Sequence, residues 1–119
     1  MSKQGNKPGD LKPNFKLWFE SDDEYIFGPG ACAILKSIHE EGTITKGAEK
    51  LGMSYRYAWG VIRRIEKKLD THLIETYKGG QTGGGGARVT EFGLHLIETY
   101  TNLNDTLERA VQRSGHITL

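Results

Sequence analysis

Residues 54–69 read Ser54-Tyr-Arg-Tyr-Ala-Trp-Gly-Val-Ile-Arg-Arg-Ile-Glu-Lys-Lys-Leu69, which has the pattern of an amphipathic helix. Ser54 can cap the first turn by accepting a hydrogen bond from a backbone N–H. The apolar residues that follow recur at intervals of four, three and four, the spacing of one buried helical face: Ala58, Ile62, Ile65 and Leu69. The outward positions carry guanidinium groups, aromatic rings and one small residue, namely Tyr55, Arg56, Trp59, Gly60, Arg63, Arg64, Lys67 and Lys68. Such side chains suit a surface that lies against nucleic acid, so we interpret the segment as a DNA-recognition helix.

A shorter helix is predicted directly upstream, over residues 43–52, with Thr45 as its cap and Gly52 as its end. The turn Gly52-Met53-Ser54 then joins the two helices, because it combines a residue tolerant of positive φ with a capping residue. Two short helices joined by a three-residue turn are the signature of a helix-turn-helix. The alternative is an ordinary helical hairpin whose basic residues only keep the surface soluble.

A hairpin with a glycine-rich loop is predicted next. Two strand-like segments, Leu73-Ile-Glu-Thr-Tyr77 and Ala87-Arg-Val-Thr90, flank Lys78-Gly-Gly-Gln-Thr-Gly-Gly-Gly-Gly86. Such a hairpin is the wing of a winged helix-turn-helix, and its glycines let backbone N–H groups approach phosphates. A Walker phosphate loop does not fit, since Ala87 and Arg88 stand where that motif needs Lys and then Ser or Thr. A flexible loop without function is the remaining alternative.

The predicted DNA contacts come from both helices and the wing. They are Thr45, Ser54, Tyr55, Arg56, Tyr57, Trp59, Arg63, Lys67, Lys78, Gln81, Thr82 and Arg88. Charge agrees with this placement, although the whole chain carries only +1. Residues 43–90 hold nine Lys and Arg against four Asp and Glu, a net +5, whereas the remainder holds seven against eleven, a net −4.

Three motifs in this order resemble the N-terminal DNA-binding domain of the ModE family of molybdate-responsive regulators. They are Ser-Tyr-Arg-Tyr-Ala-Trp at 54–59, the four-glycine wing ending at Ala87, and Val89-Thr90-Glu-Phe-Gly93, within a match over roughly residues 30–100. A broader pattern, from Gly47-Ala48 through Ile65-Glu66 and again from Thr90 to Gly93, is also similar to LysR-type regulators. Both resemblances imply a winged helix-turn-helix that dimerises and binds partly palindromic operators. Full ModE regulators also carry C-terminal molybdate-binding modules, and this chain stops shortly after its last predicted helix. We therefore expect a stand-alone DNA-binding domain, with no molybdate site and no cofactor.

The segments before the helix-turn-helix predict an added hairpin and a helix. Over residues 14–20, Phe15, Leu17 and Phe19 alternate with polar or bulky partners, and residues 24–27 can return as the second strand. We expect this hairpin to cover the core or a dimer partner; a small-molecule pocket between its strands is the less favoured alternative. Pro29 begins a helix that ends at Gly42. Its expected buried residues are Ala33, Ile34, Leu35 and Ile38.

A long final helix is predicted from its cap Thr90 to about Arg113. Its apolar residues follow a near-heptad spacing, at Phe92, Leu96, Tyr100, Leu103, Leu107 and Ala110. At roughly 34 Å the helix is longer than one winged domain needs. The predicted dimerisation seam is therefore Tyr100, Leu103, Leu107 and Ala110, with packing against its own domain as the alternative for the first turns.

These observations predict a mainly α fold with a small β component: a flexible tail over 1–13, a winged helix-turn-helix with N-terminal hairpin over 14–90, and a dimerisation helix and tail over 91–119. No catalytic or metal site is predicted, because the four histidines are scattered and Cys32 is the only cysteine. The N-terminus lacks the apolar run of a signal peptide. We expect a cytoplasmic, nucleoid-associated homodimer that binds specific double-stranded DNA to regulate transcription, with no membrane partner. A helix-mediated protein-interaction module and a small-molecule or oxyanion sensor remain alternatives.

Overall fold

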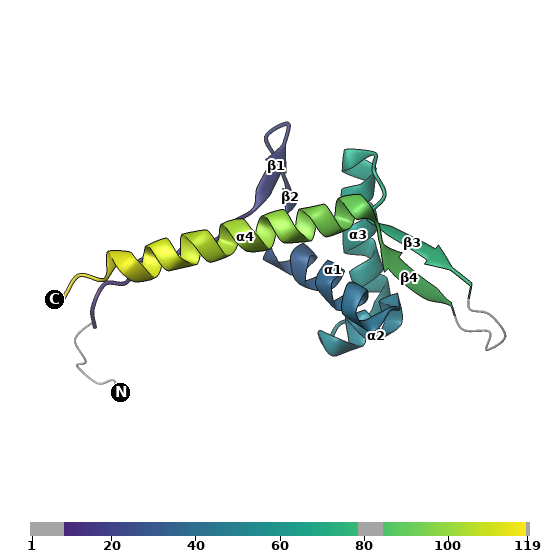
Figure 1. Cartoon of the computed structure of the whole chain (residues 1–119), viewed down its shortest axis with the longest axis horizontal. Helices are drawn as coiled ribbons and strands as arrows, with labels where there is room; N and C mark the ends of the chain where they lie inside the picture. Colours follow the sequence, from purple (N-terminus) through teal and green to yellow (C-terminus); the bar gives the residue numbers. More distant parts are fainter. Residues whose placement is uncertain (1–8, 79–84, 119) are drawn as a thin grey trace.

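The computed structural model describes residues 9–78 and 85–118. Within these ranges the chain forms helices α1 (Pro29–Glu41), α2 (Ile44–Lys50), α3 (Tyr55–Leu69) and α4 (Glu91–Ser114). Two antiparallel hairpins join strands β1 (Phe19–Ser21) with β2 (Glu24–Phe27), and β3 (Ile74–Tyr77) with β4 (Gly86–Val89). The N-terminal hairpin, the three short helices, the wing and the long last helix follow in the predicted order (Figure 1).

Helix α1 supplies the largest share of the core. It begins with Pro29 in its first turn and ends at Gly42, whose left-handed φ of 81° lets its N–H donate to the Ile38 carbonyl at 2.8 Å. Its buried residues are Ala31, Cys32, Ile34, Leu35, Ser37 and Ile38. The expected burial of Ala33 is wrong, because the buried face of this helix passes through Cys32, Ile34 and Leu35 and leaves position 33 in solvent.

Helix α2 packs tightly on α1 through Gly47. The Ser37 hydroxyl donates to the Gly47 carbonyl at 2.8 Å. A Cβ at position 47 would lie 2.8 Å from Ile38 Cγ1 and 3.0 Å from its backbone, closer than real side chains come. This approach sets the position of α2, and through the short turn it sets the position of α3.

Helix α3 buries the predicted stripe. Ala58 and Ile62 have no exposed surface, Ile65 is 4% exposed, and Leu69 is partly buried against the same core. The wing beside it pairs Ile74 with Val89 and Tyr77 with Gly86, within one residue of the predicted strands. The Ala87 N–H also donates to the Gly42 carbonyl at 2.9 Å, which ties the wing to the end of α1.

The N-terminal hairpin is shorter than predicted. Its first strand begins at Phe19 instead of residue 14, because β2 has four residues and pairs Phe19 with Phe27 at its far end. Residues 14–18 still show the predicted alternation, with Phe15 and Leu17 half-buried. They lie against α4, where the Leu17 carbonyl accepts a hydrogen bond from the Tyr100 hydroxyl at 3.0 Å.

Helix α4 crosses the domain and then projects beyond it, on the side opposite the wing (Figure 1). The molecule therefore measures 63 × 35 × 23 Å. At the far end, Leu11 and Ile117 exchange backbone hydrogen bonds of 2.8 and 2.9 Å, and His116 Nε2 lies 2.7 Å from Asp10 Oδ2. Of the expected tail, residues 1–8 lie outside the described ranges, whereas Asp10 and Leu11 contact His116 and Ile117, which follow the end of α4. Among the described helices, none has the length and apolar character needed to cross a membrane.

Candidate nucleic-acid interface

The first turn of α3 is held by the predicted cap. Ser54 has extended backbone angles, and its hydroxyl oxygen accepts a hydrogen bond from the Tyr57 N–H at 3.0 Å. The predicted cap of α2 is wrong by two residues: Thr43, not Thr45, accepts a hydrogen bond from the Lys46 N–H at 3.0 Å. Both threonines suit a cap, and Thr43 takes this role because its backbone is extended and Ile44 is the first helical residue. Thr45 instead lies exposed in the first turn of α2.

The outward residues of α3 divide between two sides. One side, which includes Arg56, Gly60, Arg63 and Lys67, is exposed beyond the buried stripe. The other side carries Tyr57, Arg64 and Lys68, which line a cleft of about 420 Å³ against Tyr25 of the N-terminal hairpin. At the tip of this hairpin, Glu24 Oε2 lies 3.3 Å from Lys68 Nζ. Tyr57 is therefore separated from the other predicted contacts.

Trp59 is not a fully outward residue as predicted. Its ring is half-buried and packs against the core, while the Arg63 guanidinium lies 5.4 Å from the ring centroid. This distance is within cation–π range. Trp59 therefore supports the side chain of Arg63 from one side.

The start of α2, the first turn of α3 and the wing surround a common hollow of about 430 Å³. It brings Thr45 and Tyr55, two predicted contacts, next to Lys46, Thr76 and Tyr77. The sequence analysis missed the last three residues. Sequence features could have identified two of them. Lys46 is adjacent to Thr45, which was predicted as a contact, and Tyr77 places an aromatic ring at the end of a predicted strand of the wing.

The wing presents two cations in the described part of its hairpin. Lys78 is exposed just after β3, and the Arg88 guanidinium lies 5.5 Å from the centroid of the Tyr77 ring. Arg88 Nε is also 3.9 Å from Glu75 Oε1, with both side chains exposed. A Cβ on Gly86 would collide with the Tyr77 ring where it now lies, so a larger residue there would require this exposed ring to move. Two further predicted contacts, Gln81 and Thr82, lie outside the described residues.

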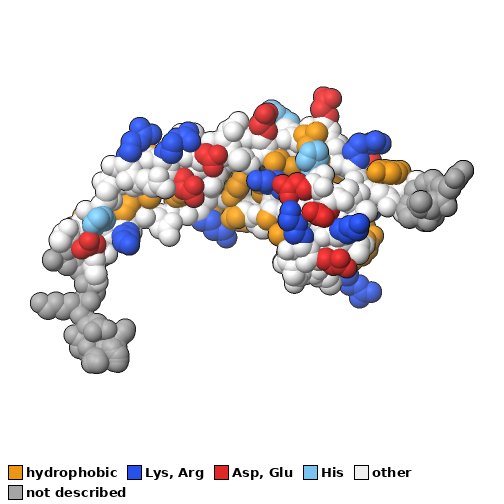
Figure 2. All heavy atoms as spheres, turned by 60° about the horizontal axis from the view of Figure 1, so that its bottom comes forward, with side chains coloured by type: hydrophobic (Ala, Val, Ile, Leu, Met, Phe, Trp, Pro, Cys, Tyr) orange, Lys and Arg blue, Asp and Glu red, His pale blue; other side chains and the backbone are white. Residues whose placement is uncertain are grey.

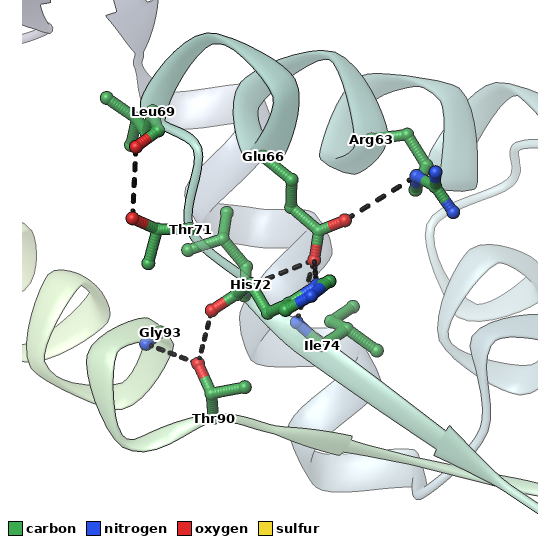
Figure 3. Close-up of polar contacts among 9 residues, drawn as sticks. Arg63, Glu66, Leu69, Thr71, His72, Ile74, Thr90 and Gly93 are labelled. Carbon is green, nitrogen blue, oxygen red and sulfur yellow. Dashed lines mark hydrogen bonds and ion pairs between the residues drawn. The ribbon is translucent and has the colours of Figure 1, made fainter.

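Glu66 is a residue that the sequence analysis did not single out. It is 8% exposed, and its Oε2 accepts hydrogen bonds from the Leu73 N–H at 2.8 Å and the Ile74 N–H at 3.1 Å (Figure 3). Its Oε1 lies 3.6 Å from Arg63 Nε, and His72 Nδ1 lies 3.9 Å from Oε2. The available signal was its position four residues after Ile62, which places a carboxylate on the edge of the buried stripe.

The start of α4 is joined to the same region by Thr90. Its hydroxyl oxygen accepts from the Gly93 N–H at 3.0 Å, the predicted cap, and its hydroxyl donates to the His72 carbonyl at 2.8 Å (Figure 3). One threonine therefore connects the loop that leads into the wing with the first turn of α4.

The predicted seam on α4 is partly occupied by the chain's own core. Tyr100 is 6% exposed and meets the rings of Phe19 and Phe27 edge-on at 5.5 and 5.6 Å. This corrects its predicted place in the seam, because little of its surface remains for a partner. Leu103 is 41% exposed, and Leu107 is half-buried. Ala110 is exposed.

A groove of about 750 Å³ runs beside the distal half of α4, between residues 14–17, α1 and the end of α2. Hydrophobic side chains show along this part of the molecule between acidic and basic groups (Figure 2). At its rim Lys50 Nζ lies 2.8 Å from Glu40 Oε1, and this hydrogen bond raises the pKa of Lys50 and lowers the pKa of Glu40. Cys32 lies at its floor, and burial raises the pKa of its thiol, which keeps it neutral in the predicted packing role. Over residues 9–78 and 85–118 there is no cluster of three or more His, Cys, Asp or Glu that could hold a metal ion.

The helix-turn-helix and wing described above belong to a known family. Residues 30–94, from the start of α1 to the first turn of α4, match the family described as bacterial regulatory helix-turn-helix protein, lysR family. The chain belongs to the LysR family. This membership confirms the predicted regulatory helix-turn-helix and the prediction that the chain is not an enzyme.

The resemblance of this LysR-family chain to ModE is also confirmed. It is 38% identical over 82 residues to the transcriptional regulator ModE of Yersinia pestis, covering 69% of this chain and 31% of that protein. It is 37% identical over 100 residues to the DNA-binding transcriptional dual regulator ModE of Escherichia coli K12, covering 84% of this chain and 38% of that protein. The chain thus spans about a third of the length of these relatives.

The fold of the LysR-family chain is similar to that of CbnR_DBD in its crystal structure with DNA. The TM-score is 0.55 at 19% identity, covering 71% of this chain and 91% of that chain. At this identity the similarity establishes the fold alone. It confirms the predicted winged helix-turn-helix architecture.

Proposed function

We propose that this LysR-family chain binds specific double-stranded DNA as a homodimer and so regulates transcription. One observation carries the proposal: the capped start of α3, the start of α2 and the wing converge on one concave surface rich in hydrogen-bond donors. The names of its relatives support it, since ModE of Escherichia coli is called a DNA-binding regulator and CbnR_DBD was crystallised with DNA. The proposed place of action is the nucleoid in the cytoplasm, where chromosomal DNA lies.

In this proposal α3 enters the major groove, and its first turn reads base edges. Arg56 can offer a fork of two N–H donors to a guanine, and Tyr55 lies beside it facing the hollow. Arg63 reads a further base about two turns along. Ser54 keeps its O–H as a donor to phosphate while its oxygen caps the helix.

The remaining contacts are proposed to fix the register of the protein on the duplex. Cations at the edges of the surface neutralise phosphates, namely Lys46, Lys67, Lys78 and Arg88. Thr45 donates to phosphate from the start of α2. Tyr57 and Trp59 take supporting roles, and Gln81 and Thr82 are proposed wing contacts outside the described residues.

Dimerisation through α4 is the second part of the proposal. The helix has 24 residues, about 36 Å, and its distal half leaves Leu103, Leu107 and Ala110 at least partly uncovered by its own chain. The groove on the neighbouring face of α4, which Tyr100 and Val111 line, offers further surface on which the α4 of a second copy can lie. Two recognition helices held about 34 to 36 Å apart would then meet successive major grooves.

The test begins with a duplex that the protein itself enriches from a random library. Fluorescence anisotropy then compares this duplex with a scrambled duplex of the same composition at several salt concentrations. We expect preference for the enriched duplex by about a thousandfold or more, and a linear fall of log affinity with log salt. Sedimentation at micromolar protein concentration should give a dimer.

Equal binding of both duplexes would remove sequence recognition from the proposal. Binding that does not change with salt would favour the protein-interaction module, whose basic face makes no phosphate contacts. A monomer at micromolar concentration would remove the proposed α4 interface.

A further inference from the structure

Glu66 combines a buried carboxylate with a place on the proposed DNA-reading helix. It lies on α3 with 8% of its side chain exposed, whereas Glu and Asp are almost never buried unless they are paired. Both carboxylate oxygens have partners, and these partners lie on different elements (Figure 3). The residue therefore connects parts of the proposed interface.

The first oxygen holds the base of the wing. Oε2 accepts the N–H groups of Leu73 and Ile74, two consecutive residues at the point where the chain enters β3. These backbone groups are buried and need an acceptor. The wing is thereby fixed directly to α3.

The second oxygen faces a cation that points toward solvent. Oε1 is 3.6 Å from Arg63 Nε, and on its other side the Arg63 guanidinium lies 5.4 Å from the Trp59 ring. The Arg63 side chain is 65% exposed, yet these two contacts restrict an otherwise flexible chain. A side chain that is already ordered loses less conformational freedom when it binds.

The carboxylate also acts on the surroundings of Arg63. A negative charge beside the guanidinium disfavours a nearby phosphate, but it leaves the remaining N–H donors available to neutral acceptors such as guanine O6 and N7. This arrangement favours a base edge over a phosphate as the partner of Arg63.

We propose that Glu66 is a positioning residue for sequence discrimination, which acts by holding Arg63 on Trp59 in the orientation that reads a base. The inference rests on the proposed sequence-specific DNA binding. The competing explanation is a purely structural role, in which Glu66 only accepts the two N–H groups of β3.

Glu66→Gln separates the two explanations. Its amide oxygen can still accept the Leu73 and Ile74 N–H groups, but its NH2 group cannot attract Arg63. The probes are the duplex enriched by the 119-residue chain and its scrambled counterpart. We expect the preference for the enriched duplex to fall by about two- to tenfold, with binding of the scrambled duplex unchanged or stronger. The thermal midpoint should change by only a few degrees.

Two further variants test whether Glu66 affects the duplex preference through Arg63. In an Arg63→Ala background, Glu66→Gln should cause no additional loss of preference, because the two residues act through one interaction. Glu75→Gln is the matched control. Like Glu66→Gln it removes one negative charge beside an arginine, here the wing residue Arg88, but Glu75 is exposed and accepts no buried N–H group. It should leave the preference unchanged.

A measurement on the unaltered protein does not depend on any variant folding. NMR relaxation of the Arg63 Nε–H without DNA should show restricted motion relative to Arg64, an exposed neighbour on the same helix. Equal mobility of the two arginines would overturn the proposal. So would an unchanged preference in Glu66→Gln, or a proportional loss on both duplexes with a large fall in the thermal midpoint. If the unaltered chain itself showed no preference between duplexes, the proposed function would fail and this inference with it.

Discussion

Helix α3 and the distal half of α4 differ in how much of their apolar surface is buried by the chain itself. On α3 the apolar stripe is buried within the chain, and the exposed positions carry cations and aromatic rings that donate hydrogen bonds. On α4 beyond Tyr100, apolar residues such as Leu103 stay exposed, beside a groove that the chain leaves open. One chain therefore completes the packing of α3, whereas α4 has the character of half an interface.

The strongest test of this contrast places charge on the open face of α4. Leu103→Asp with Leu107→Asp would bury unpaired carboxylates in a dimer, while in a single chain their cost is small. We expect a folded monomer whose affinity for the enriched duplex falls by about a hundredfold or more, because the second binding event is no longer intramolecular. Sedimentation velocity and anisotropy measure the two effects.

The matched control for that variant is Leu94→Asp, which alters an exposed leucine of α4 within the domain. It should remain dimeric. A double mutant that also remains dimeric would move the interface away from Leu103 and Leu107.

A pair of glycines tests how strictly the chain itself positions α3. Gly47→Ala forces a Cβ against Ile38 and should lower the free energy of unfolding by about 1–3 kcal/mol. At Gly60, on the exposed side of α3, a Cβ meets no atom within 4 Å, so Gly60→Ala should raise stability by about 0.4–1 kcal/mol. Urea unfolding of both variants gives the comparison, and equal effects would show that the contact of α2 with α1 is not tight.

The reading side of α3 is tested by Arg56. Arg56→Ala should cost about 1–3 kcal/mol on the enriched duplex, with little loss on the scrambled duplex. Arg64→Ala is its control, because Arg64 lies on the other side of the helix, in the cleft with Tyr25. Equal weakening on both duplexes would make Arg56 a phosphate contact only.

The smallest predicted effect concerns the wing. Removing Lys78 and Arg88 together should lower the slope of log affinity against log salt by about 1.8, since each phosphate contact contributes about 0.9. Anisotropy titrations between low and moderate salt give this slope. An unchanged slope would remove both residues from the proposed interface.

The fold could be predicted from sequence where the pattern is local. Ser54, the stripe from Ala58 to Ile65 and the cap Thr90 each depend on neighbours within a few residues, and all three were correct. The choice between Thr43 and Thr45 as a cap failed, since both have suitable side chains and only the backbone angles distinguish them.

The parts that could not be predicted depend on contacts distant in sequence. Tyr100 fits a heptad seam by spacing, but Phe19 and Phe27 bury it from more than seventy residues away in the chain. Glu66 looks like a solvated residue in a basic helix until β3 brings two backbone N–H groups to it. Trp59 likewise has an outward spacing, yet its large ring reaches back to the core.

Helix α4 is fixed to its own domain only along its first part, which gives the molecule the mechanics of a lever. Thr90 holds the first turn and the buried Tyr100 holds the helix about ten residues further on, so the pivot lies at Tyr100. Beyond Tyr100 the helix continues to Ser114, a rigid arm of about 21 Å, and a swing of about 9° displaces its far end by about 3 Å, close to the rise of one base pair. In the proposed dimer assembled through α4, the stiffness of the attachment at Thr90 and Tyr100 would therefore set how strictly the spacing between two DNA half-sites is measured.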